Sequence, residues 1–223
     1  MRPLHLRRLS WTVTFLLLWP FPSWAIETPL SDTAVREAYF LGQRHDEALA
    51  RFMDKYTLHL AQPEKGPYVE SIMLLTPFAI MAEYASKQSN YSAQQAQLDH
   101  KKMQELVRVE VQITLTESYG PYLSRPTGSR SDSPTGIQMR NSDFWQNFRV
   151  RLFQDEELVK PLDSSGQPTY SCSDGGSCTL SGAVIQFIYP AEAFTGKSAV
   201  VQVDLPEGEG EPLAVEFDLT AMR

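Results

Sequence analysis

The sequence predicts an α+β fold in which an N-terminal helical segment is followed by an antiparallel, immunoglobulin-like β-sandwich. Apolar residues recur every three to four positions in the first half of the chain and then every second position. Turn-forming residues separate the alternating segments, as is typical of sandwich strands. The predicted organisation is a leader (1–25), a mainly helical region (26–104) and a sandwich domain (105–223) that contains a long loop (118–147).

The first 25 residues have the pattern of a secretory signal peptide. A basic start precedes an apolar run at 11–19, and small residues before Ala25 occupy the positions that an export peptidase reads. The run is shorter than the roughly 20 residues of a transmembrane helix, so we expect cleavage after Ala25 and no transmembrane segment in the mature chain. Arg7 and Arg8 suit a twin-arginine signal poorly, which favours general secretion. The protein is therefore expected in the periplasm or outside the cell.

The mature chain is acidic. The leader holds three of the 20 basic residues and none of the 27 acidic ones, so its removal changes the formal net charge from −7 to −10. Nucleic acids and anionic membranes bind through clustered Lys and Arg, and the absence of such a stripe argues against both as partners. The apolar share of 42% argues against disorder of the whole chain.

Two cysteines, Cys172 and Cys178, flank the sequence Ser-Asp-Gly-Gly-Ser. Extended segments joined by such a turn bring their ends together, and an oxidising compartment lets the sulfurs bond. A zinc site would need four ligands, but His45, His59 and His100 have no metal-binding spacing, and a redox pair usually has two intervening residues. We therefore expect a structural disulfide, with no metal and no cofactor.

The segment 31–60 has helical periodicity. One stripe of it is apolar and consists of Leu49, Phe52, Met53, Tyr56 and Leu60. Residues 41–49 share features with a tetratricopeptide repeat, but no second copy follows, which favours an ordinary helical hairpin. Next come a predicted buried strand at 68–75 and a helix at 78–86, capped by Thr76 and Pro77. A capping box at Ser92 opens another helix, which is predicted to end near Met103.

The period changes to two after Gln104, which predicts a strand at 107–115 with one buried and one solvent-facing side. Further strands are predicted at 148–152, 184–189, 201–205 and 213–219. The loop 206–212 alternates Glu with Gly; calcium binding is one interpretation, but a solvated loop is the more usual one.

The long loop is unusual for a compact domain, because loops of about thirty residues are commonly functional or disordered. It combines aromatic and charged side chains of the kind found at binding surfaces. The candidate binding residues are Tyr119, Tyr122, Arg125, Arg130, Asp132 and Arg140. The alternative is a mobile loop held at one end by Trp145, a side chain that we expect to be largely buried beside Phe144 and Phe148.

Four short blocks carry a resemblance to known proteins. They read Ala-Tyr-Phe-Leu-Gly at 38–42, Tyr-Ser-Ala-Gln-Gln-Ala at 91–96, Glu-Ser-Tyr-Gly-Pro at 117–121 and Tyr-Ser-Cys at 170–172. With these blocks the chain resembles a family of exported bacterial proteins that has no assigned activity. The resemblance covers nearly the whole mature chain and implies a bacterial origin, but it brings no site residues.

Two functions remain open at this stage. The first is a non-enzymatic envelope or extracellular protein that binds another protein or a glycan. The second is a secreted hydrolase with a site assembled from distant residues. The chain lacks a Gly-x-Ser-x-Gly elbow and a His-Glu-x-x-His motif, but a pair of carboxylates needs no fixed spacing. A deep pocket in which a histidine meets Ser or Asp would favour the enzyme, and we name no catalytic residue.

Overall fold

The computed structural model describes residues 26–124 and 137–223. The predicted leader and the candidate residues Arg125, Arg130 and Asp132 lie outside these residues. The described chain combines α-helices with a larger share of antiparallel β-strands, as the α+β class requires. None of its helices has the length and apolar character needed to cross a membrane.

The helices of the described chain are α1 (Asp32–Gly42), α2 (Glu47–Asp54), α3 (Pro77–Ser86) and α4 (Ala93–His100). Short 3-10 turns are η1 (Phe144–Asn147), η2 (Ala191–Ala193) and η3 (Leu219–Ala221). The strands are β1 (Thr57–His59), β2 (Tyr68–Leu75), β3 (Leu106–Thr114), β4 (Tyr122–Ser124), β5 (Ile137–Met139), β6 (Arg149–Gln154), β7 (Glu157–Val159), β8 (Asp163–Cys172), β9 (Cys178–Pro190), β10 (Ser198–Asp204) and β11 (Leu213–Asp218).

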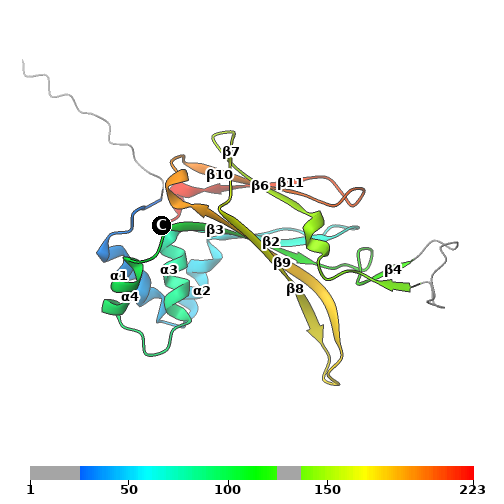
Figure 1. Ribbon diagram of the computed structural model, residues 1–223, viewed down its shortest axis with the longest axis horizontal. Helices are drawn as coiled ribbons and strands as arrows, with labels where there is room; N and C mark the ends of the chain where they lie inside the picture. The colour runs from blue at the N-terminus through cyan, green and yellow to red at the C-terminus, as the bar shows by residue number, and fades with distance from the viewer. Residues whose placement is uncertain (1–25, 125–136) are drawn as a thin grey trace, which may run out of the picture.

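These strands form two main sheets and one separate ribbon. The larger sheet has the order β1-β2-β3-β9-β8, the smaller has the order β11-β10-β6-β7, and β4 pairs only with β5. Figure 1 shows the four helices at one end of the larger sheet, while the β4–β5 ribbon and the tip of the β8–β9 hairpin extend away from them.

One hydrophobic core joins the two main sheets. Along β3 every second side chain is buried, as predicted, and these side chains share a cluster with others from β6 and β10: Val107, Val109, Val111, Ile113, Leu152, Val201 and Val203. Full burial of such an aliphatic side chain contributes about 1.5 to 3 kcal/mol. The period-two pattern therefore identified the inner face of β3 correctly.

The outer face of β3 differs from the prediction. It is not open to solvent along its length, because the helices pack against this side of the sheet and bring Glu83 of α3 into contact with Arg108. The side chains of Arg108 and Glu110 are only 18% and 20% exposed. A polar strand face indicates that water or a polar partner covers it, and here the partner is a helix.

The caps of α3 and α4 confirm the sequence prediction. The Thr76 hydroxyl accepts from the Ala79 N–H at 3.4 Å, and the Ser92 hydroxyl accepts from the Gln95 N–H at 3.1 Å. The α4 helix ends at His100, three residues earlier than predicted.

The predicted helical span 31–60 is wrong at its end. Residues 57–59 form β1, because the Tyr56 carbonyl accepts from the Leu74 N–H at 2.9 Å and β2 then captures the following residues as a paired strand. The region 26–104 therefore contains two strands as well as its four helices.

The disulfide between Cys172 and Cys178 is confirmed. The two residues are directly paired at the end of the β8–β9 hairpin, and Gly176 in the connecting turn has a positive φ of 79°, which glycine adopts without strain. Strand β8 itself was not predicted, since its sequence is polar and mostly exposed.

The predicted long loop is partly regular. The β4–β5 ribbon lies inside it, and Tyr119 and Phe144 are buried in the main core. Trp145 is partly rather than largely buried: it packs against the core and covers Gly166 of β8, where a Cβ would approach the indole to 2.5 Å. Its anchoring position was predicted correctly, while its burial was overestimated.

Candidate functional site

The predicted binding residues of the loop divide into structural and exposed ones. Tyr119 is buried, and the Arg140 guanidinium carbon lies 3.5 Å from the centre of its ring. Arg140 also donates from Nε to the Gly120 carbonyl at 2.9 Å. Burial raises the pKa of the Tyr119 hydroxyl, with Arg140 opposing and Glu209 reinforcing the shift. Tyr119 and Arg140 therefore hold the base of the ribbon, whereas Tyr122 is 57% exposed.

An apolar hollow lies between the β4–β5 ribbon and the β8–β9 hairpin. We call it the ribbon hollow; its volume is about 440 Å³, and it is lined by Gln138, Met139, Arg140, Asn141, Ser142, Tyr170 and Leu180. Met139 is 63% exposed and Tyr170 is 52% exposed, while Leu180 is buried. Tyr122 is the direct cross-strand partner of Met139, so both side chains lie on one face of the ribbon.

The local sequence explains this geometry. The Arg140 N–H donates to the Pro121 carbonyl at 2.7 Å, which closes the base of the ribbon, and the ring of Tyr119 holds the same arginine from below. Across the hollow, β8 pairs with β9 and brings Tyr170 opposite Leu180. Four large apolar side chains are thereby exposed on the ribbon and on β8: Tyr122, Leu123, Met139 and Tyr170. Exposed groups of this kind mark interaction surfaces in many proteins.

Sequence reasoning identified Tyr122 but missed Met139 and Tyr170. The available signal was weak: Tyr170 stands in a polar segment where a solvent-facing strand has no need of a large aromatic ring. That signal becomes clear only when the pairing with β9 shows that the segment is a strand.

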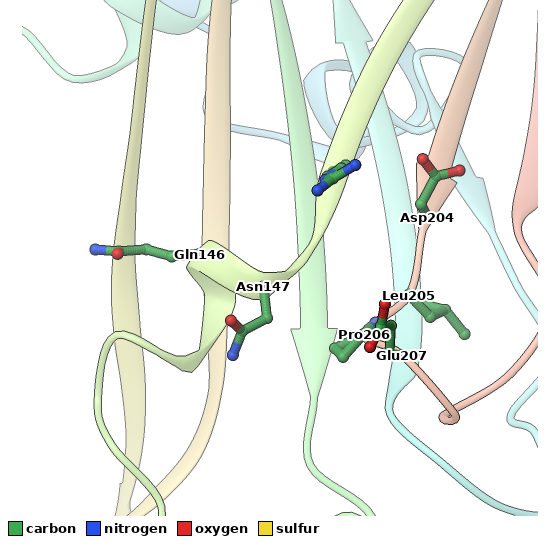
Figure 2. A pocket seen from close by; sticks show the side chains of 7 residues that line it. Gln146, Asn147, Asp204, Leu205, Pro206 and Glu207 are labelled. Carbon is green, nitrogen blue, oxygen red and sulfur yellow. The ribbon is translucent and has the colours of Figure 1, made fainter.

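A second hollow is polar and of similar size, about 440 Å³. It is lined by Gln146, Asn147, Arg149, Asp204, Leu205, Pro206 and Glu207 (Figure 2). Asp204 already accepts hydrogen bonds from Arg151 at 2.7 and 2.9 Å, and Gln146 points away from it. The best-placed charge is thus already neutralised, and the hollow is less suited to binding than the ribbon hollow.

His100 is the only one of the three mature-chain histidines that is largely buried. Its Nε2 lies 2.9 Å from Glu105 Oε1. The same carboxylate accepts from the Leu30 N–H at 2.6 Å and from the Thr28 hydroxyl at 2.7 Å. The adjoining cavity has a volume of only about 50 Å³. This arrangement fastens the N-terminal segment to the end of α4 and leaves no room for a substrate.

The other two histidines lie at the surface. His59 is 3.7 Å from Asp54, with both side chains well exposed, and His45 is exposed. Within residues 26–124 and 137–223 no histidine makes a hydrogen bond to a serine, and no group of three His, Cys, Asp or Glu is placed to hold a metal. The described residues therefore offer no support for the hydrolase alternative.

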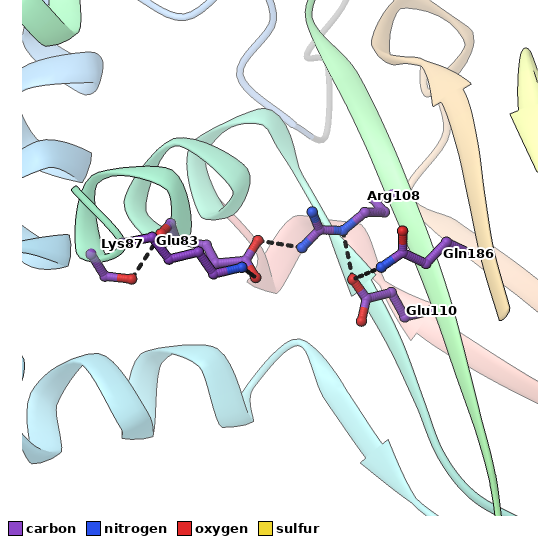
Figure 3. A network of polar contacts seen from close by, with 6 residues as sticks. Glu83, Lys87, Arg108, Glu110 and Gln186 are labelled. Atoms are coloured by element: carbon purple, nitrogen blue, oxygen red, sulfur yellow. Dashed lines mark hydrogen bonds and ion pairs between the residues drawn. The ribbon is translucent and has the colours of Figure 1, made fainter. Parts of the chain in front are cut away.

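The most extensive ionic network lies between α3 and the larger sheet (Figure 3). Arg108 contacts Glu83 on one side and lies 2.8 Å from Glu110 on the other, although its Nε–H is poorly aligned for a hydrogen bond there. Gln186 donates to Glu110 at 3.1 Å, and Lys87 pairs with Glu83 at 2.6 Å.

This network is structural in character. Burial alone would raise the pKa of Glu83, but hydrogen bonds from Lys87 and Arg108 outweigh that effect and hold it below its ordinary value. The charges satisfy one another between a helix and two strands, with no cavity beside them to admit a ligand.

Comparisons with known proteins add no functional assignment. Neither the family models nor the curated proteins include a match to this chain.

Proposed function

We propose that this is an exported, non-enzymatic binding protein that contacts another protein of the envelope or the extracellular space through the ribbon hollow. The observation that carries the proposal is the exposure of Tyr122, Met139 and Tyr170 around one hollow. Tyr and Met are enriched in protein interfaces, and apolar side chains that the fold leaves open gain free energy when a partner covers them.

The proposed partner is a protein rather than a glycan because of the lining. Sugar sites rely on convergent polar groups, and here the exposed area is dominated by a thioether and two phenol rings. Arg140 at the edge is held by the ring of Tyr119 and by the Gly120 carbonyl, so its position is established before binding.

Export is part of the proposal. The disulfide lies at an exposed hairpin tip, where a reducing compartment would open it, and the first 25 residues have the pattern of a leader. The resemblance to a family of exported bacterial proteins agrees with this location. We further propose that the fold is an N-terminal helical segment followed by an immunoglobulin-like sandwich of the two sheets, a scaffold that presents binding loops at its ends.

A capture experiment tests the proposal. The exported protein, immobilised, is exposed to envelope and culture-fluid extracts of its own cells. The double variant Tyr122→Ser with Met139→Ser is compared with the control Leu158→Ser with Leu162→Ser, which removes two equally exposed apolar side chains from a distant region. We expect the wild type and the control to retain the same protein, and the ribbon variant to lose it.

Each alternative has a distinct outcome. Retention that survives protease treatment of the extract but is lost with a glycosidase would indicate a glycan. Equal retention by the ribbon variant and the control would reject the ribbon hollow as the contact surface.

A further inference from the structure

A separate apolar hollow lies where the loop between β1 and β2 meets the loop between β10 and β11. We call it the sheet-end hollow; its volume is about 320 Å³, within the range of small-molecule sites. Its apolar lining comes from Leu60, Pro63, Pro67, Val69, Leu205 and Leu213. None of these side chains belongs to the ribbon hollow, so the two hollows are independent.

The walls of the sheet-end hollow are held in place without a ligand. Gly66 has a positive φ of 87°, and a side chain at this position would collide with the Glu209 carbonyl, so the two loops touch backbone to backbone. The Gly66 N–H donates to the Ser118 hydroxyl at 2.8 Å, and the Thr116 hydroxyl donates to the Gly66 carbonyl at 2.6 Å. A hollow whose walls are already ordered loses little conformational entropy when it is filled.

The charges at this hollow are unbalanced. Glu209 and Glu211 line it together with the single cation Lys65. Glu209 is half-buried, and among the described residues its carboxylate makes no hydrogen bond or ion pair. A carboxylate that is partly removed from water beside apolar side chains gains stability from a cation.

We infer that the sheet-end hollow binds a small amphipathic organic cation, with its apolar body against Leu205 and Leu213 and its ammonium group at Glu209. A metal ion suits the site less well, because it needs several oxygen ligands and the described residues contain no group of three His, Cys, Asp or Glu placed to hold one. An ammonium group needs only one carboxylate, and the aliphatic and proline lining accepts its hydrocarbon tail.

Calorimetric titration of the purified exported protein with octylammonium chloride tests the inference, with octanoate as the probe of equal chain length and opposite charge. We expect saturable binding of one octylammonium per chain and at least tenfold weaker binding of octanoate. Glu209→Gln should weaken octylammonium binding about tenfold, the effect of losing one charge-assisted contact.

Two further variants locate the ligand. Glu207→Gln removes the same charge from the same loop, but Glu207 does not line the sheet-end hollow, so the affinity should be unchanged. Ala61→Trp places a large ring at an exposed position of the lining and should weaken binding by blocking it. The inference is overturned by absence of octylammonium binding, by equal binding of octanoate, by equal effects of the two glutamine variants, or by full affinity of Ala61→Trp.

Discussion

The helical end of the molecule and its ribbon end use similar residue types in opposite ways. At the helical end, Arg108 is enclosed between two carboxylates and the ring of Tyr56 is fully buried. At the ribbon end, Arg140 lies on an aromatic ring at the edge of a hollow, and the rings of Tyr122 and Tyr170 face solvent. The helical end therefore spends these groups on stability, while the ribbon end keeps them available for contact.

The largest expected effect is at the helical end. Arg108→Ala leaves Glu83 and Glu110 facing each other with Lys87 as the remaining cation, and we expect a loss of about 3 kcal/mol in the free energy of unfolding. Urea denaturation measures it. The control Arg151→Ala breaks a more exposed pair with Asp204 and should cost less than about 1 kcal/mol. Equal losses would show that burial of the network contributes nothing.

The second effect is at the base of the ribbon end. Gly166→Ala places a methyl group 2.5 Å from the Trp145 indole, and we expect a loss of about 2 kcal/mol from this overpacking. Trp145 is the only tryptophan outside the leader, so a red shift of its fluorescence should accompany the loss. Gly175→Ala, in the open turn of the hairpin tip, is the control. An unshifted emission spectrum in Gly166→Ala would contradict the proposed contact.

The disulfide should contribute less than the Trp145 contact. Closing so short a loop removes on the order of 2 kcal/mol of chain entropy, and the exposed tip can open locally, so we expect Cys172→Ser to cost about 1 kcal/mol globally. Hydrogen exchange should accelerate near residues 170–180 and stay unchanged in β3. Accelerated exchange throughout the larger sheet would mean that the tip stabilises the whole fold.

The smallest effect is a pH dependence that arises at Glu83. Its pKa in the folded protein lies below the ordinary value of 4.5, so the ionised carboxylate favours the folded state. This stabilisation is fully present above the unfolded pKa and is lost as the pH falls through the folded pKa. Glu83→Gln should therefore flatten the fall in stability in the acidic range, measured by urea titrations at a series of pH values. Parallel pH profiles for the two proteins would exclude Glu83 as a source.

Much of the fold could be predicted where the signal is local to one element. The alternation in β3 indicates burial of every second side chain whatever the partner, and Thr76 followed by proline begins α3 through a cap formed within four residues. The cysteine pair needed only a short turn between two extended segments. In these cases the determining contacts lie within the segment itself or across a single turn.

The sequence by itself thus determined the buried face of β3, the helix caps and the disulfide, while the tertiary structure decided the features that depend on a partner. Strand β8 is polar and contains Pro168, and it is a strand because β9 pairs with it along its length. The outer face of β3 is covered because α3 places Glu83 over Arg108. The ribbon hollow exists because chain folding brings Met139 to within one hollow of Tyr170, 31 residues further along. A residue pattern encodes which side of an element is apolar, but the group that meets that side depends on long-range packing.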